Sequence, residues 1–224
     1  ESNSMIQVWE HDTNNLVYEI NVSTVSEASA NEAIIISDLA LSSDGLIGAV
    51  TLITGEVLVW DMPTGDILWL SRQHTSIVKE AEFTPDARLL ITADEQGTVI
   101  IWDVATGETD PTDIIADSTG VTAMAISPNG QYLAIGGRES ITVWDMSSET
   151  LLYDALRAHT NAVSVLLFDP QSEYLFSGSR DRRIIQWDVA TGNQLQFFES
   201  DSDWVLSLAI SPHGTRLVSG DLTG

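Results

Sequence analysis

The chain has 224 residues, of which 43% are hydrophobic, and it contains seven tryptophans and no cysteine. Without cysteine it can form neither a disulfide nor a thiolate metal site, and cysteine content does not indicate an oxidising or a reducing compartment. The formal net charge is −24, which disfavours binding to the phosphate backbone of nucleic acids and to anionic membranes. No apolar stretch approaches the ~20 residues of a membrane span. We expect a soluble chain of unknown compartment, with the cytoplasm favoured over secretion.

A tryptophan–aspartate pair recurs along the chain at nearly constant spacing. A period of this length is typical of a unit of four short strands that buries its faces only by stacking on its neighbours. A degenerate pair, Trp9-Glu10, lies 51 residues before the first complete one. The complete pairs follow at intervals of 42, 42 and 43 residues: Trp60-Asp61, Trp102-Asp103, Trp144-Asp145 and Trp187-Asp188.

Alternating runs of Val, Ile and Leu predict antiparallel strands along the whole chain. The chain opens on a half unit, residues 1–20, with the third and fourth strands of a repeat. Residues 21–33 are polar, which predicts a solvated insertion loop that is either a linker or a partner-binding loop. Residues 199–224 supply only a first and a second strand. The four complete units lie between these segments, at residues 34–70, 71–115, 116–156 and 157–198.

The aspartate after the repeated tryptophan predicts a tight turn. An Asp side chain can accept hydrogen bonds from backbone N–H groups, and Gly tolerates a positive φ. Each of these turns should therefore close a hairpin between a third and a fourth strand. Three copies of the turn read alike: Asp61–Gly65, Asp103–Gly107 and Asp188–Gly192.

These repeats resemble the WD-repeat (WD40-type) β-propeller family over nearly the whole chain. The resemblance implies an all-β fold of four-stranded antiparallel blades, with four complete blades and two half blades. One possibility is that the half blades unite and close a five-bladed ring. The favoured alternative is that the chain is a segment of a longer protein, with open blade edges through which chains can associate.

One repeat carries the complete polar set by which the family holds loops to a blade. The resemblance implies that the four side chains form a buried hydrogen-bond chain. A Ser-His-Asp hydrolase would need an exposed serine beside an oxyanion hole, whereas the repeat places this serine inside a strand. We therefore expect a structural network and no catalytic residue. The set consists of His159, Ser177, Asp181 and Trp187.

The other repeats depart from this set. His74 stands at the histidine position of the Trp102 repeat, but Gln96 replaces the turn aspartate. We therefore expect only one complete network. The histidine position of the remaining repeats is acidic, with Glu32, Asp117 and Asp201.

Motifs for cofactors and metals are missing from the sequence. No Gly-Lys dipeptide occurs, so a phosphate-binding P-loop is excluded. The four histidines have no two-His ligand spacing, which argues against a zinc centre. We predict neither a cofactor nor a metal site.

The family resemblance places recognition at the rim where loops before first strands meet turns before third strands. Trp204 stands there at a position that Ile77, Gly120 and Ala162 occupy in other repeats. A large indole there is either a plug or an anchor for a partner. Polar turn residues complete the predicted partner-binding surface: Arg180, Arg182, Arg138, Glu139, Asp94 and Glu95.

The favoured hypothesis is a non-catalytic scaffold or sensor module that docks other polypeptides and belongs to a larger multidomain protein. Its acidic charge would steer in partners with basic surfaces, or it only maintains solubility. The alternative is a propeller with a ligand, cation or catalytic site in its central channel. The candidate residues for that site are Glu32, Asp117 and Asp201.

Overall fold

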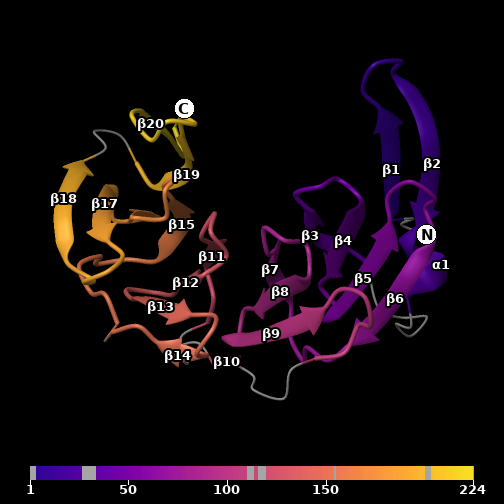
Figure 1. The fold of residues 1–224 in the computed structure, drawn as a ribbon, viewed down its shortest axis with the longest axis horizontal. Coiled ribbons are helices and arrows are strands. Elements are labelled where there is room, and N and C mark those ends of the chain that lie inside the picture. Colours follow the sequence, from indigo (N-terminus) through magenta and orange to yellow (C-terminus); the bar gives the residue numbers. More distant parts are fainter. Residues whose placement is uncertain are drawn as a thin grey trace. The chain divides into compact units, whose positions relative to one another are not determined.

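The computed structural model describes residues 4–26, 34–109, 114–115, 120–153, 155–199 and 203–223. Over these residues the chain forms four antiparallel sheets of four strands and two of two strands, with one short helix (Figure 1). The predicted all-β fold of four-stranded antiparallel units is confirmed. The chain divides into two compact units, unit 1 (Glu1–Asp94 and Ile100–Asp113) and unit 2 (Glu95–Val99 and Ile114–Gly224).

Unit 1 begins with a two-stranded sheet and continues into four-stranded ones. The first sheet consists of β1 (Met5–Glu10) and β2 (Asn15–Asn21). The second consists of β3 (Ile36–Leu41), β4 (Ile47–Leu52), β5 (Glu56–Asp61) and β6 (Ile67–Arg72). The third has β7 (Val78–Phe83), β8 (Leu89–Asp94) and most of β9 (Thr98–Asp103). The first two residues of β9 belong to unit 2, where they pair with β10 (Ile114–Ile115).

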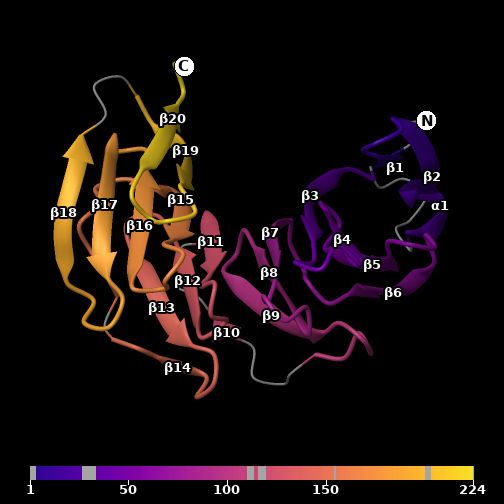
Figure 2. The same cartoon turned by 45° about the horizontal axis from the view of Figure 1, so that its top comes forward.

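Unit 2 repeats the same strand order, and its β15–β18 sheet is seen with the four strands side by side in Figure 2. Its first sheet consists of β11 (Ala123–Ile126), β12 (Tyr132–Gly136), β13 (Ile141–Asp145) and the short β14 (Thr150–Leu151). The second consists of β15 (Val163–Phe168), β16 (Tyr174–Ser179), β17 (Arg183–Asp188) and β18 (Gln194–Glu199). The last consists of β19 (Val205–Ile210) and β20 (Leu217–Asp221).

The inner strands of unit 1 bury both of their faces. Alternate side chains of β4 and β5 point in opposite directions, because the side-chain period of a strand is two. Val50 and Leu58 pack with β1 and β2, whereas Ala49 and Val59 pack with β7 to β9. Burial of a large aliphatic side chain contributes about 1.5–3 kcal/mol. The stacking of one sheet on the next therefore forms the core of this unit.

The repeated aspartate turns form as the sequence predicts. In the turn after β5 the Thr64 N–H donates to Asp61 Oδ1 at 2.9 Å, and Gly65 adopts a φ of 78°. The same bond in the turn after β17 joins Thr191 N–H to Asp188 Oδ1 at 2.9 Å. The carboxylate satisfies backbone donors that the tight turn leaves without a strand partner.

The structure differs from the predicted insertion loop at its first residues, 21–25, which form the end of a strand and a short helix. Asn21 is the last residue of β2, and its side chain caps helix α1 (Val22–Val25) by accepting a bond from the Ser23 N–H at 3.1 Å. Val22 is fully buried in the core of unit 1. The isolated valine folds inward because its burial outweighs the polarity of its neighbours. Residues 27–33 lie outside the described part of the chain.

Candidate functional site

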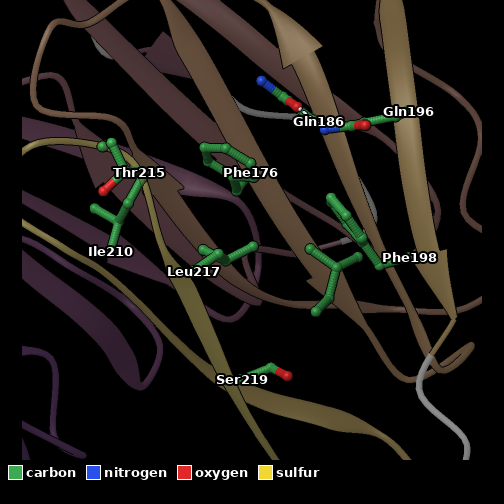
Figure 3. Close-up of a pocket in the computed structure, with 10 residues that line it drawn as sticks. Phe176, Gln186, Gln196, Phe198, Ile210, Thr215, Leu217 and Ser219 are labelled. Atoms are coloured by element: carbon green, nitrogen blue, oxygen red, sulfur yellow. Dashed lines mark hydrogen bonds between the residues drawn. The ribbon is translucent and has the colours of Figure 1, made fainter.

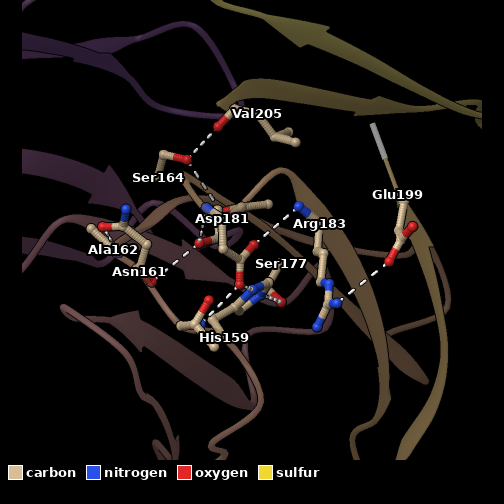
Figure 4. A network of polar contacts seen from close by, with 12 residues as sticks. His159, Asn161, Ala162, Ser164, Ser177, Asp181, Arg183, Glu199 and Val205 are labelled. Carbon is tan, nitrogen blue, oxygen red and sulfur yellow. Dashed lines mark hydrogen bonds and ion pairs between the residues drawn. The ribbon is translucent and has the colours of Figure 1, made fainter. Parts of the chain in front are cut away.

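Four polar side chains of unit 2 form one hydrogen-bonded chain, which we call the His159 clamp. Figure 4 labels three of them, His159, Ser177 and Asp181. His159 precedes β15, Ser177 lies in β16, Asp181 lies in the turn between β16 and β17, and Trp187 lies in β17. The His159 ring contacts Asp181 Oδ2 through Nδ1 at 2.9 Å and Ser177 Oγ through Nε2 at 2.8 Å. The Trp187 Nε1–H donates to Ser177 Oγ at 2.8 Å.

The direction of each bond follows from the chemistry of the groups. The indole N–H can only donate and an ionised carboxylate can only accept, so Ser177 accepts from Trp187 and the His159 ring donates its Nδ1–H to Asp181. Nε2 of the neutral ring is then the acceptor of the Ser177 O–H. Burial lowers the pKa of His159, although the charge of Asp181 partly opposes this shift. The clamp is thus a neutral imidazole held between a hydroxyl and a carboxylate.

Asp181 also fixes the turn in which it lies. Its Oδ2 accepts the Thr160 N–H at 2.9 Å and its Oδ1 accepts the Arg183 N–H at 3.0 Å. Burial by itself would raise the pKa of this carboxyl, but the Thr160 bond and the neighbouring His159 outweigh burial and lower it. Arg182 stands in this turn with a φ of 71°, in the left-handed region that non-glycine residues seldom adopt. One carboxylate thus ties the turn to the loop before β15.

The same turn carries an arginine that stacks on the candidate anchor. The Arg180 guanidinium lies 5.0 Å from the ring centre of Trp204, which is 38% exposed. The Arg180 backbone N–H donates to the Ala162 oxygen at 2.9 Å. We call this exposed pair and the neighbouring Arg182 the Arg180–Trp204 rim. A cation over an indole face is favoured by about 0.5–1 kcal/mol at exposed sites, so each side chain restrains the other.

Three more of the predicted surface residues are exposed on unit 2. Arg138 and Glu139 lie in the turn between β12 and β13, and Glu95 lies in the turn that precedes β9. The turn with Arg138 is joined to β15, because the Val163 N–H donates to the Gly137 oxygen at 3.0 Å. Within the predicted surface, Arg180 lies in direct side-chain contact with Trp204.

Asp94 does not belong to an exposed rim. Its side chain is fully buried in unit 1, and its Oδ2 lies 3.1 Å from His74 Nδ1. His74 Nε2 contacts Thr92 Oγ1 at 2.7 Å, and the Trp102 Nε1–H donates to the same oxygen at 2.8 Å. These four residues form a second network, the His74 clamp. The expectation of a single complete network is therefore wrong.

A signal for the His74 clamp was present in the sequence. His74 and Thr92 are 18 residues apart, and Thr92 and Trp102 are 10 apart. The spacings from His159 to Ser177 and from Ser177 to Trp187 are the same. Threonine supplies the same hydroxyl chemistry as serine. The repeat pattern predicts the carboxylate in the turn, whereas Asp94 reaches the ring from the end of β8.

In the sheets of Trp60 and Trp144 the second strand carries no hydroxyl at the position of Thr92 and Ser177. The Trp60 Nε1–H donates to the Tyr18 hydroxyl of β2 at 3.2 Å. Trp144 Nε1 is buried and has no hydrogen-bond partner among the described residues. Val50 and Ile135 lie on the second strands where the clamps have Thr92 and Ser177. Trp60 thus has a hydrogen-bond partner on the preceding sheet, whereas Trp144 has none among the described residues.

A groove of about 490 Å³ lies elsewhere in unit 2, between β16–β18 and β19–β20 (Figure 3). Its lining is apolar with amide and hydroxyl groups and contains no titratable side chain. It can therefore offer packing and hydrogen bonds to a ligand, but no acid or base. The lining residues are Phe176, Ile184, Gln186, Gln196, Phe198, Ile210, Gly214, Thr215, Leu217 and Ser219.

The channel acids of the alternative hypothesis, Glu32, Asp117 and Asp201, lie outside the described residues. Within the described ranges, no group of three or more His, Asp or Glu side chains is placed to hold a metal ion. In the same part of the chain, no helix has the length and apolar character needed to cross a membrane.

Comparison with known proteins identifies the repeat. No curated protein matches the chain. The family model of the WD domain, G-beta repeat (WD40), matches four times, at residues 66–103, 111–145, 150–188 and 192–224. These matches cover more than half of the chain and include both clamps. Proteins built from such repeats generally serve as scaffolds for protein–protein interaction. The chain belongs to the WD40 repeat family.

Proposed function

We propose that this chain is a non-catalytic scaffold that docks other polypeptides on the Arg180–Trp204 rim. The observation that carries the proposal is the partly exposed indole of Trp204, held 5.0 Å from the Arg180 guanidinium. Tryptophan and arginine are the side chains most enriched among residues that dominate interface energies. Trp204, Arg180 and Arg182 would make the central contacts. Arg138, Glu139 and Glu95 would form a polar surround.

The His159 clamp supports this role through rigidity. It holds the turn of Arg180 and Arg182 by bonds from Thr160 and Arg183 to one buried carboxylate. A surface that is ordered before binding loses less conformational entropy when a partner docks. The clamp residues are buried, so they would position the rim and not touch the partner.

Affinity capture with matched tryptophan variants tests the proposal. The chain would be compared with Trp204→Ala and with Trp9→Ala, which removes an indole that is 53% exposed on β1. We expect polypeptides that the wild-type chain and Trp9→Ala retain and that Trp204→Ala loses. Equal retention by both variants would show that docking takes place elsewhere. Circular dichroism of each variant controls for loss of fold.

A further inference from the structure

We infer that the segment seated on the Arg180–Trp204 rim is an acidic stretch of polypeptide, with an apolar side chain next to its carboxylates. The inference rests on the proposed docking function and names the chemistry of the partner. It reverses the expectation from net charge, which favours basic partners.

Positive charge is concentrated on this rim. The chain has only nine basic residues against 33 acidic ones, yet three of the nine, Arg180, Arg182 and Arg183, lie within four consecutive positions. Arg183 is engaged within unit 2, where its guanidinium lies 3.4 Å from Glu199 and 5.4 Å from the Phe197 ring centre. Arg180 and Arg182 are exposed. Two exposed guanidinium groups thus stand two positions apart on a strongly anionic chain, and the nearest carboxylate in sequence to Trp204, that of Asp203, accepts the Trp204 N–H at 2.8 Å.

The backbone that carries the two arginines is braced on both sides. Arg180 donates its N–H to the Ala162 oxygen at 2.9 Å, and Arg182 donates its N–H to the Ser179 oxygen at 3.1 Å. Between them, Asp181 is held by the His159 ring at 2.9 Å. An arginine presents a planar fork that matches both oxygens of a carboxylate. A braced turn allows two such forks to bind with a small loss of entropy.

Trp204 adds an apolar requirement. Arg180 lies over its ring at 5.0 Å, and the indole remains 38% exposed. Indole rings contribute a large apolar contact area at interfaces. An apolar partner side chain on the indole would bring an adjacent carboxylate close to Arg180. The preferred segment is therefore acidic and apolar together.

Net charge selects a peptide over nucleic acid as the anionic partner. A charge of −24 repels a long polyanion at distances up to about 8–10 Å, the Debye length near physiological ionic strength. A short segment with one or two carboxylates experiences less of this repulsion. Its contacts with the rim arginines act at much shorter range.

Selection from a displayed library of random twelve-residue peptides, with the 1–224 chain as bait, tests the inference. We expect the enriched peptides to contain more Asp and Glu than the input, next to an apolar residue. The strongest peptide would then be titrated by fluorescence anisotropy. The double variant Arg180→Ala/Arg182→Ala should weaken its binding at least tenfold. The matched control Arg88→Ala/Arg216→Ala, which removes two exposed arginines from other turns, should change it less than twofold.

One further variant of the chain and one change in the peptide separate the contribution of charge from that of the planar guanidinium geometry. Arg180→Lys/Arg182→Lys keeps both charges but loses the planar forks, so it should bind with an affinity between those of the wild-type chain and the double alanine variant. Replacement of Glu and Asp in the peptide by Gln and Asn should weaken binding as much as the double alanine variant does. Tenfold tighter binding after replacement of Glu by phosphoserine would contradict the inference, because phosphate would then be the recognised group.

The remaining outcomes distinguish failure of the inference from failure of the proposed function. Enrichment of neutral peptides whose binding is lost in Trp204→Ala would overturn the acidic segment and leave docking at the rim intact. Peptides that bind Trp204→Ala as well as they bind the wild-type chain would overturn the rim as the docking site. A selection without any enriched peptide would overturn the peptide-segment inference, while the affinity capture described above would still report on docking.

Discussion

In unit 2 the clamp aspartate is Asp181, in the turn after β16, whereas in unit 1 it is Asp94, the last residue of β8. Both carboxylates bind the Nδ1 of their histidine, at 2.9 and 3.1 Å. Asp94 pairs with Val78 in the ladder, as Ser179 pairs with Val163 in unit 2. Its carboxylate thus starts two positions earlier in the repeat than that of Asp181 and reaches the same ring.

Each histidine ring thus has a carboxylate at Nδ1, but the two carboxylates come from different positions of the repeat. The position decides what else the carboxylate holds. Asp181 also accepts backbone N–H groups from Thr160 and Arg183, so the clamp of unit 2 braces the turn that presents Arg180 and Arg182. The two clamps share one chemistry and differ in how they are coupled to the surface.

The largest expected effect is the loss of a clamp tryptophan. Trp102→Ala should destabilise unit 1 by about 3–5 kcal/mol, which is typical when a buried aromatic ring is removed. Trp187→Ala should cost unit 2 about 1 kcal/mol less, because Trp102 in addition stacks on Trp69 with ring centres 5.4 Å apart. Urea denaturation followed by hydrogen-exchange mass spectrometry reads the two units separately. Equal losses in both would show that the stacked pair adds nothing.

Glu80 should make the stability of unit 1 fall as pH rises toward neutrality. Glu80 of β7 and Asp38 of β3 occupy the same repeat position. Burial, with a contribution from the charge of Asp38, raises the pKa of Glu80 from 4.5 to about 7. The folded chain therefore holds this proton more tightly than the unfolded chain, and the resulting stability is lost as pH rises from about 4.5 through 7.

Glu80→Gln tests this pH dependence. The wild-type unit 1 should lose stability of the order of 2 kcal/mol between pH 4.5 and pH 8, and the variant should lose much less. Glu108→Gln, at an exposed position of the same unit, is the control and should behave as the wild-type chain does. Melting at a series of pH values measures the effect. A variant with the wild-type pH profile would exclude Glu80 as the source.

The clamp of unit 1 can be weakened and then rebuilt in the arrangement of unit 2. Asp94→Ala leaves the buried His74 without its carboxylate and should cost about 1–3 kcal/mol. The double variant Asp94→Ser/Gln96→Asp places a carboxylate at the position of Asp181 and should recover most of this loss. Hydrogen exchange of β8 and β9 reports the result. Failure of the double variant to recover stability would mean that a carboxylate at position 96 does not reach His74 in unit 1.

The smallest expected effect is a loss of stability of unit 2 at acidic pH. Because the pKa of His159 is lowered by burial, the unfolded chain binds this proton first, and unit 2 loses stability as pH falls through about 6.5. Nuclear magnetic resonance of the imidazole ring should show a titration midpoint below that ordinary value. In Asp181→Asn the charge that partly opposes burial is absent, so the midpoint should fall further. A higher midpoint in this variant would contradict the assigned cause.

Much of the site could be predicted from local pattern. The tryptophan–aspartate spacing located the strands and assigned Ser177 to a strand interior, and the resemblance to the WD-repeat family implied that Ser177 is buried and hydrogen-bonded with Trp187. The placement of Asp94 was not predictable in the same way, because an aspartate at the end of a strand before a turn is ordinarily solvated. Burial of Val22 was missed for a related reason, since a single valine among polar residues has no period.

The sequence by itself determined the repeat, the antiparallel strands and the aspartate turns, because these depend on spacing along the chain and on the preferences of single residue types. The residues of one clamp followed from the resemblance of its repeat to the WD-repeat family. Only the tertiary structure decided that Asp94 reaches His74, that Trp69 stacks on Trp102, and that Arg180 lies over Trp204. The residues of each pair come from different segments of the chain. Their contact depends on how the connecting strands and loops pack, which no local pattern records.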